Sequence, residues 1–219
     1  MKIAVAINGC ERYDLTKITL ESFLKYNTAP NWSVWYGDDA STDERIFKLM
    51  KKYNIPIVVK NEKRLGCART KDLLLHAAAD KYKPDYIYLL ENDIETARET
   101  SISYLEKVFQ IPDVQIFRMW GKYKDRERKQ PWTSRNHAKP GDPKCQWRST
   151  KIEGEIVHYG DIHWSFQPNI IETNLALTLI KDITKEEDVW ESGKHNAIQP
   201  FPLAAFPKIN MTYHLGRGK

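Results

Sequence analysis

Residues 32–53 read WSVWYGDDASTDERIFKLMKKY, and this stretch contains the structural unit that decides the fold of the N-terminal half. Trp32–Tyr36 is a short apolar run typical of a strand, and an acidic turn follows it. Asp43–Tyr53 then carries apolar side chains at helical spacing. These apolar positions are Ile46, Leu49, Met50 and Tyr53. A strand that passes through a polar turn into an amphipathic helix is the repeating unit of α/β proteins.

The same unit recurs on both sides of this stretch. We expect further strands at Lys2–Ile7, Ile55–Val59 and Tyr86–Leu90, and further helices at Asp14–Tyr26, from Cys67 to about Asp80, and at Ile102–Phe109. Asp14 is the expected N-cap of the first helix, because its carboxylate can accept a hydrogen bond from a free backbone N–H. Strands that alternate with helices predict an α/β fold with a doubly wound, mostly parallel sheet and helices on both faces.

Composition places the chain among ordinary folded proteins. Of its 219 residues, 41% are hydrophobic and 29% are charged, which excludes collagen-like and disordered chains. No apolar run approaches the roughly 20 residues that span a bilayer, and the sequence turns polar at Asn8, too early for a signal peptide. We therefore expect a cytoplasmic protein. The three cysteines are odd in number and far apart, so we expect reduced thiols rather than disulfides or a zinc site.

Positive charge is concentrated in residues 118–151, which we call the basic segment. It contains eleven Lys or Arg against three Asp or Glu, an excess of +8, whereas the whole chain carries only +5. Because the segment also contains several Pro and Trp residues and few aliphatic ones, we expect a long surface loop or lid. It divides one merged domain into residues 1–117, the α/β half, and residues 152–219, which we expect to add antiparallel strands. Short strands are expected at residues 156–159 and 164–166, an acidic helix at 183–192, and further strand or loop at 203–213.

Two acidic turns follow predicted strands. They are Gly37–Asp43, after the second strand, and Glu91–Glu95, after the fourth. Carboxylates that meet at the carboxyl edge of a parallel sheet repel one another unless a cation or hydrogen-bond donors balance them. Mg²⁺ and Mn²⁺ take one or two carboxylates and complete their coordination with water and phosphate oxygens. Helix capping is the better explanation of either turn taken alone, but two turns at the same edge favour a metal and phosphate site.

Four motifs in sequence order resemble the nucleotide-sugar half of family-two glycosyltransferases, which have the GT-A fold. They are Asn8-Gly9, Asp38 to Asp43, Asn61 with Leu65 to Arg69, and Leu89 to Asp93. The chain also departs from the family pattern at three positions. Ala40 replaces the usual glycine, Thr70 the usual asparagine, and Glu91 the first aspartate of the metal turn.

The C-terminal half extends the resemblance. Glu187-Asp188 resembles the motif whose aspartate serves these enzymes as general base, and Asp161 is the alternative base. His214 resembles their late metal-binding histidine, and Trp164 lies in a segment that resembles their acceptor side.

The resemblance implies a metal-dependent, inverting glycosyltransferase that moves a sugar from a nucleotide-sugar donor to an acceptor hydroxyl. UDP is favoured as the carrier because it is the usual one in this family. The implied donor-binding residues are Asn8, Asp39, Arg69, Glu91 and Asn92, and the implied ligands of Mn²⁺ or Mg²⁺ are Asp93 and His214. Asp188, or alternatively Asp161, would take the proton from the attacking hydroxyl.

The basic segment lies where such an enzyme recognises its acceptor. Lys122, Arg126 and Arg128 stand among Trp and Tyr residues, a combination that suits phosphate contacts and ring stacking. We therefore expect a polyanionic acceptor, either DNA with hydroxylated bases or an acidic bacterial or phage surface glycan. The alternative is a solvated loop that closes over the donor diphosphate.

Three other functions remain open at this point. A sugar-phosphate nucleotidyltransferase shares the nucleotide crevice, but it needs a glycine-rich loop, and the turn at residues 8–12 has one glycine. A metal-dependent nuclease could use Asp38, Asp39, Glu91 and Asp93. A non-catalytic polyanion-binding protein would keep the fold and use only the basic segment.

Overall fold

The first half of the chain forms the expected parallel sheet. The computed structural model describes residues 1–119, 122–123, 147–160, 168–180, 203–207 and 211–215. Its first elements are β1 (Ile3–Gly9), α1 (Tyr13–Tyr26), β2 (Trp32–Asp38), α2 (Glu44–Lys52), β3 (Ile57–Lys60), α3 (Cys67–Tyr82) and β4 (Tyr86–Glu91). The four strands are parallel and lie in the order β3, β2, β1, β4.

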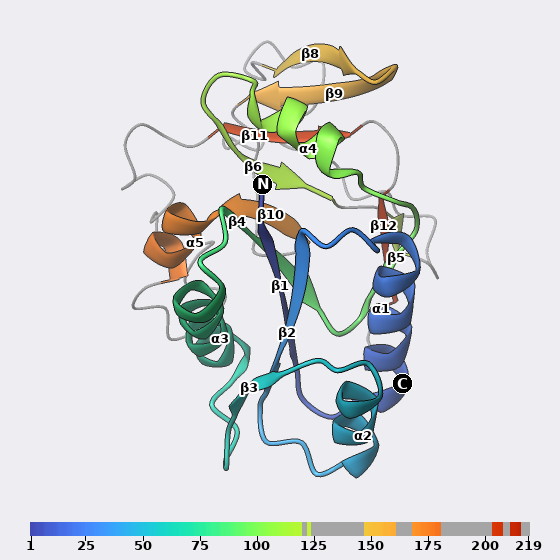
Figure 1. Ribbon diagram of the computed structural model, residues 1–219, viewed down its shortest axis with the longest axis vertical. Coiled ribbons are helices and arrows are strands. Elements are labelled where there is room, and N and C mark those ends of the chain that lie inside the picture. The colour runs from blue at the N-terminus through green and yellow to red at the C-terminus, as the bar shows by residue number, and fades with distance from the viewer. Residues whose placement is uncertain (120–121, 124–146, 161–167, 181–202, 208–210, 216–219) are drawn as a thin grey trace.

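Alternation of side chains along the strands builds one hydrophobic core on each face of the sheet. Val5 of β1 clusters with Phe23 of α1 and Ile46 of α2, whereas the neighbouring Ala6 clusters with Leu74 of α3. Figure 1 shows the result, with α1 and α2 on one side of the sheet and α3 and α5 on the other. Gly37 lies under α3, where an added Cβ would come within 3.2 Å of Leu74. The doubly wound arrangement with helices on both faces is confirmed.

The rest of the chain, from residue 102 onward, extends the same sheet and includes the expected antiparallel strands. The added elements are α4 (Ile102–Phe109), β6 (Val114–Arg118), β8 (Trp147–Ile152), β9 (Glu155–Gly160), β10 (Asn169–Glu172), α5 (Thr173–Ile180) and β11 (Leu203–Pro207). The nine strands lie in the order β3, β2, β1, β4, β10, β6, β11, β9, β8. β10 is antiparallel to both of its neighbours, and β11 is parallel to β6 but antiparallel to β9. The last part of the chain therefore supplies interior strands.

A second, three-stranded sheet carries the end of the chain back to the first half. It consists of β5 (Ile94–Thr96), β12 (Thr212–His214) and β7 (Lys122–Tyr123), in the order β5, β12, β7. His214 lies opposite Ile94 in this sheet, and the Leu215 N–H donates to the carbonyl of Asp93 at 2.8 Å. Pairing with β5 thus brings His214 to the acidic turn after β4.

Two sequence predictions about local structure are wrong. The N-cap of α1 is Arg12, in a left-handed conformation with φ of 58°, and Asp14 lies inside the first turn, where its charge is favourable to the helix dipole. The basic segment is not a loop at its ends, because Arg118 closes β6 in the interior and residues 147–151 belong to β8. Backbone pairing with β9 stabilises β8, although it is a polar strand at the edge of the sheet.

The remaining expectations for the second half fall partly outside the described residues. Residues 120–121 and 124–146 of the basic segment, the strand expected at 164–166 and the helix expected at 183–192 all lie outside them. Where the chain is described, no helix combines the length and the apolar character needed to cross a membrane.

Candidate active site

The connections of the parallel strands create a crevice between β1 and β4. The chain runs outward from β1 to β2 and β3 and then returns to β4 on the other side of β1, so adjacent connections diverge at this point. Ligands of open α/β sheets bind at such switch points, beside the carboxyl ends of the strands. A cavity of about 580 Å³ lies there, lined by residues 8–12, Asp39, Arg64, Cys67 and residues 91–93. Asn8, Asp39, Glu91, Asn92 and Asp93, predicted from separate motifs, therefore meet in one cavity.

Asp39 is held by hydrogen bonds from the loop that precedes α3. Its Oδ1 accepts hydrogen bonds from the Leu65 N–H at 2.7 Å and from Nδ2 of Asn61 at 2.9 Å, and its Oδ2 accepts one from the Gly66 N–H at 3.0 Å. Burial raises the pKa of Asp39, but these hydrogen bonds more than offset it, so the pKa of the carboxyl lies below its usual value. Asp39 is therefore an ionised group that ties the loop at residues 61–66 to the end of β2.

The turn after β2 requires an unusual backbone conformation at Ala40. Its φ is 60°, in the left-handed region that glycine adopts without strain, which gives a physical reason for glycine at this position in the family pattern. The Asp38 Oδ2 accepts the Ser41 N–H at 3.0 Å and closes the turn, while Asp43 caps α2 by accepting the Arg45 N–H at 3.0 Å. The turn therefore does two things: Asp43 caps α2, as expected, and Asp39 lines the cavity.

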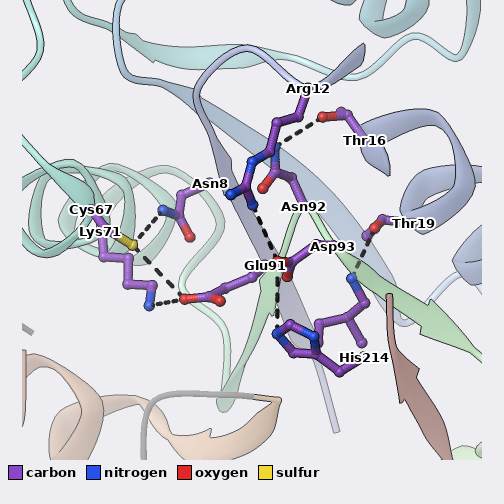
Figure 2. Close-up of polar contacts among 11 residues, drawn as sticks. Asn8, Arg12, Thr16, Thr19, Cys67, Lys71, Glu91, Asn92, Asp93 and His214 are labelled. Carbon is purple, nitrogen blue, oxygen red and sulfur yellow. Dashed lines mark hydrogen bonds and ion pairs between the residues drawn. The ribbon is translucent and has the colours of Figure 1, made fainter. Parts of the chain in front are cut away.

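Glu91 is neutralised by a buried lysine. The Lys71 Nζ donates to Oε1 of Glu91 at 2.6 Å, and only 2% of the lysine side chain and 13% of the glutamate side chain are exposed. The Cys67 thiol lies 3.8 Å from the same oxygen and accepts a hydrogen bond from Nδ2 of Asn8 at 3.1 Å. Figure 2 shows this group as one side of the site.

Asn92 anchors the turn after β4 to α1. Its Nδ2 donates to Oγ1 of Thr16 at 3.1 Å, and the Ile94 N–H donates to Oγ1 of Thr19 at 3.1 Å (Figure 2). The close packing depends on Gly9, because a Cβ there would come within 2.8 Å of the Asn92 amide nitrogen. The turn that carries Asp93 is thus positioned by a glycine and two threonine hydroxyls.

Asp93 faces two cationic or cation-binding side chains. Its Oδ2 lies 3.3 Å from Nη1 of Arg12 and 3.7 Å from Nε2 of His214. Figure 2 shows the two side chains pointing toward Asp93. Its Oδ1 is buried and accepts no hydrogen bond from any residue that the structure describes. The two residues predicted as metal ligands, Asp93 and His214, are therefore neighbours although they stand far apart in the sequence.

This pair fits a hard divalent ion. In octahedral coordination, two adjacent ligands each about 2.1 Å from Mg²⁺ lie about 3.0 Å apart, so a small side-chain movement from the observed 3.7 Å would bring this carboxylate and imidazole to that separation. The free Oδ1 of Asp93 offers a further acceptor. Within the described residues, no group of three or more His, Cys, Asp or Glu is arranged to hold a metal. A site with two protein ligands leaves positions for water and phosphate oxygens, as Mg²⁺ and Mn²⁺ require.

The structure does not bring Arg69 into the cavity. Its guanidinium pairs with Asp72 on the same helix, and 55% of its side chain is exposed. Arg64 lines the cavity instead. Sequence reasoning also missed Lys71 and Arg12. The spacing of Lys71 could have indicated that it is buried. It precedes Leu74, Leu75 and Ala78 of the same helix by three, four and seven residues, so it lies on the apolar face of that helix.

The acceptor side is described only at its edge. The backbone of Lys122 lies in β7 and pairs with Tyr213 of β12, so the basic segment begins beside the strand that carries His214. Five other predicted residues lie outside the described part of the chain. They are Arg126, Arg128, Trp164 and the two candidate bases, Asp161 and Asp188.

Comparison with protein families decides the assignment. The model of Glycosyl transferase family 2 matches residues 5–170, which include β1 and both acidic turns. The chain belongs to glycosyl transferase family 2. This assignment favours the transferase over the nucleotidyltransferase, the nuclease and the non-catalytic polyanion-binding protein.

Solved structures of another protein share the fold. S. aureus TarS 1–349 is similar with a TM-score of 0.55 and 14% identity, over 83% of this chain and 49% of that chain. The same fragment in complex with UDP gives a TM-score of 0.50 and 17% identity, over 60% of this chain and 39% of that chain. The chain thus spans at most about half the length of these structures, and the likeness is one of fold, as expected for a GT-A protein. No curated protein matches the sequence.

Proposed function

We propose that this glycosyltransferase uses a UDP-sugar and a divalent metal ion to glycosylate an acceptor hydroxyl with inversion at the anomeric carbon. The observation that carries the proposal is the proximity of His214 to Asp93, which lines the switch-point cavity, with Oδ2 of Asp93 and Nε2 of His214 separated by 3.7 Å. UDP is favoured because the S. aureus TarS fragment, which shares the fold, was solved in complex with UDP.

Each described residue then has a defined task. Asp93 and His214 would hold Mn²⁺ or Mg²⁺, which supplies neutralising charge for the leaving diphosphate when it is bound. Asn8 and Glu91 form one wall of the cavity, and Asp39 holds the loop at residues 61–66 that borders it. Arg64, rather than Arg69, lines the cavity with a basic side chain that can contact the donor's phosphates.

A thermal-shift screen tests the donor and the metal together. The chain is heated with UDP, GDP, nucleoside triphosphates or single-stranded DNA, each with and without Mn²⁺. A nucleotide at about 100 times its Kd stabilises the fold by about 2.7 kcal/mol, which corresponds to a Tm rise of roughly 5 to 10 °C. We expect this rise with UDP plus Mn²⁺. Stabilisation by DNA plus Mn²⁺ without any response to nucleoside diphosphates would instead support a nuclease or a polyanion-binding protein.

We propose Asp188 as the base that takes the acceptor's proton, with Asp161 as the alternative. In the family pattern the equivalent aspartate performs this step, and a positioned general base contributes about 10²- to 10⁴-fold in rate. Asp188→Asn should keep UDP binding and lose transfer by that factor, measured as UDP release from a panel of UDP-sugars with added acceptors. Full activity of Asp188→Asn together with an inactive Asp161→Asn would assign the base to Asp161.

We propose that the basic segment binds a polyanionic acceptor, which is either DNA with hydroxylated bases or an acidic surface glycan. Lys122 begins β7 beside β12, so this segment starts next to the strand of the candidate metal ligand His214. Replacing Lys122, Arg126 and Arg128 by glutamine should weaken polyanion binding. It should also make the plot of log binding constant against log salt concentration less steep, by the amount that corresponds to about three phosphate contacts. Unchanged binding would indicate a loop that serves only the donor side.

A further inference from the structure

Arg12 occupies the place at Asp93 where a cation is expected. Its Nη1 lies 3.3 Å from Oδ2 of Asp93, the same oxygen that faces His214. Figure 2 shows the guanidinium and the imidazole reaching this carboxylate from two directions. Arg12 comes from the start of α1 and His214 from β12, so neither position depends on the other.

The backbone before α1 holds Arg12 in this place in a conformation that is energetically unfavourable. Both Glu11 and Arg12 are left-handed, with φ of 55° and 58°, and such conformations cost about 1 to 2 kcal/mol per residue for side chains with a Cβ. The turn is fixed on both sides, because the Glu11 carboxylate accepts the Thr42 N–H at 2.8 Å and the Arg12 carbonyl accepts the Thr16 N–H at 3.0 Å. Strained residues of this kind persist where the surrounding structure determines them, and they are concentrated at functional sites.

The two members of the ion pair differ in their access to solvent. The Arg12 side chain is 42% exposed and lines the cavity, whereas the Asp93 side chain is only 8% exposed. The arginine can therefore leave the pair by rotating into the cavity, while the carboxylate cannot follow it. An ion pair with one exposed partner is weak, so a divalent ion can displace the guanidinium.

We propose that Arg12 is a built-in competitor of the metal ion. Its guanidinium neutralises Asp93 in the metal-free enzyme, is displaced when the ion binds, and then contacts the diphosphate of the donor in the same cavity. The inference rests on the proposed metal and donor site. It predicts an order of binding, with the metal before the nucleotide, because only the displaced arginine is available to phosphate.

The test measures metal and nucleotide binding separately and needs no acceptor. Arg12→Gly removes the competitor and relieves the left-handed strain, and Arg12→Gln removes the charge while keeping a polar side chain. Binding of Mn²⁺ alone is followed by the loss of its electron paramagnetic resonance signal, and binding of UDP at saturating Mn²⁺ by calorimetry. If the pair is closed about 90% of the time, its removal tightens Mn²⁺ binding by about tenfold. In the same variants, UDP binding should become weaker by about tenfold because a phosphate contact is lost.

Arg64→Ala is the matched control, since Arg64 lines the same cavity without an ion pair to Asp93 among the described contacts. It should change Mn²⁺ affinity by less than twofold. Equal Mn²⁺ affinity in wild type, Arg12→Gly and Arg12→Gln, combined with metal-dependent UDP binding, would overturn the competitor and leave the proposed function intact. Absence of Mn²⁺ binding in all variants would overturn the metal site and the competitor with it. Tighter Mn²⁺ binding in both Arg12 variants, but not in Arg64→Ala, supports the proposal.

Discussion

Glu91 and Asp93 stand two residues apart on one turn, but their surroundings differ. Glu91 pairs with Lys71, whose side chain is almost fully buried, and Asp93 pairs with Arg12, whose side chain is largely accessible. A buried lysine that leaves its carboxylate loses the ion pair without regaining water, whereas an exposed arginine regains hydration. The accessibility of the counter-charge therefore separates a carboxylate that stabilises the cavity wall from one that is available to a metal ion.

The sharpest test of this difference replaces each carboxylate in turn. Asp93→Ala should weaken Mn²⁺-dependent UDP binding by about 100-fold or more, because it would remove one of the two proposed metal ligands. Glu91→Gln should weaken the same binding by less than about tenfold, because Glu91 is already neutralised by Lys71. Calorimetry with UDP at fixed Mn²⁺ gives both values. Equal losses in the two variants would show that both carboxylates bind the ion.

The stability of the chain should depend more on the Glu91 side. Lys71→Met leaves a partly buried carboxylate without its cation, and breaking such a pair costs about 3 to 5 kcal/mol. Chemical denaturation measures this loss. The double variant Lys71→Met with Glu91→Gln should recover most of it, and Lys81→Met, at an exposed position of the same helix, should change stability by less than about 0.5 kcal/mol. A Lys71→Met protein as stable as wild type would contradict a structural role for the pair.

Asp39 is a third carboxylate of the cavity, balanced by hydrogen bonds rather than by a cation. Its pKa is lowered in the folded state relative to about 3.9 in an unfolded chain, so it stabilises the fold above that pH, and the stabilisation is lost as the pH falls through the folded pKa. Asp39→Asn should cost about 2 kcal/mol at neutral pH. The stability curves of wild type and variant should converge below about pH 4. Parallel curves down to pH 2 would show that the charge of Asp39 does not contribute.

The smallest expected effect is at Ala40, in the turn beside Asp39. Glycine adopts a φ of 60° without the steric cost that alanine bears, so Ala40→Gly should stabilise the fold by about 0.5 to 1 kcal/mol. Ala79→Gly, in the interior of α3, should instead destabilise by about 1 kcal/mol. Thermal unfolding of the two variants distinguishes them by sign. A loss of stability in Ala40→Gly would mean that the turn is not held in the left-handed region in solution.

The parallel half of the fold was predictable because local pattern and global arrangement agree there. Each strand is a short apolar run followed by a turn and an amphipathic helix, and parallel strands bring their carboxyl ends to one edge. The same rule predicted that Asp39 and Asp93 would meet. The strand β10 was not predicted, because four residues between two antiparallel partners have no periodicity that distinguishes them from a loop.

The charges around the cavity were harder to predict than its carboxylates. Arg64 lies in the loop before α3 and lines the cavity, whereas Arg69, five residues later in the first turn of α3, pairs with Asp72 on the same helix. Arg12 was overlooked because a left-handed N-cap is a tertiary effect, fixed by the Glu11 contact with Thr42. The expected cap, Asp14, was the better choice by local preference alone.

The position of β10 and β11 has a consequence for biosynthesis. β10 lies between β4 and β6, and β11 lies between β6 and β9. Strands that are synthesised early therefore pair with strands that are synthesised much later. While the chain leaves the ribosome, the outer edge of β4 stays open until residues 169–172 have emerged. An unpaired strand edge readily joins edges of other chains. We therefore expect the nascent polypeptide, rather than the finished enzyme, to be the form that depends on chaperones.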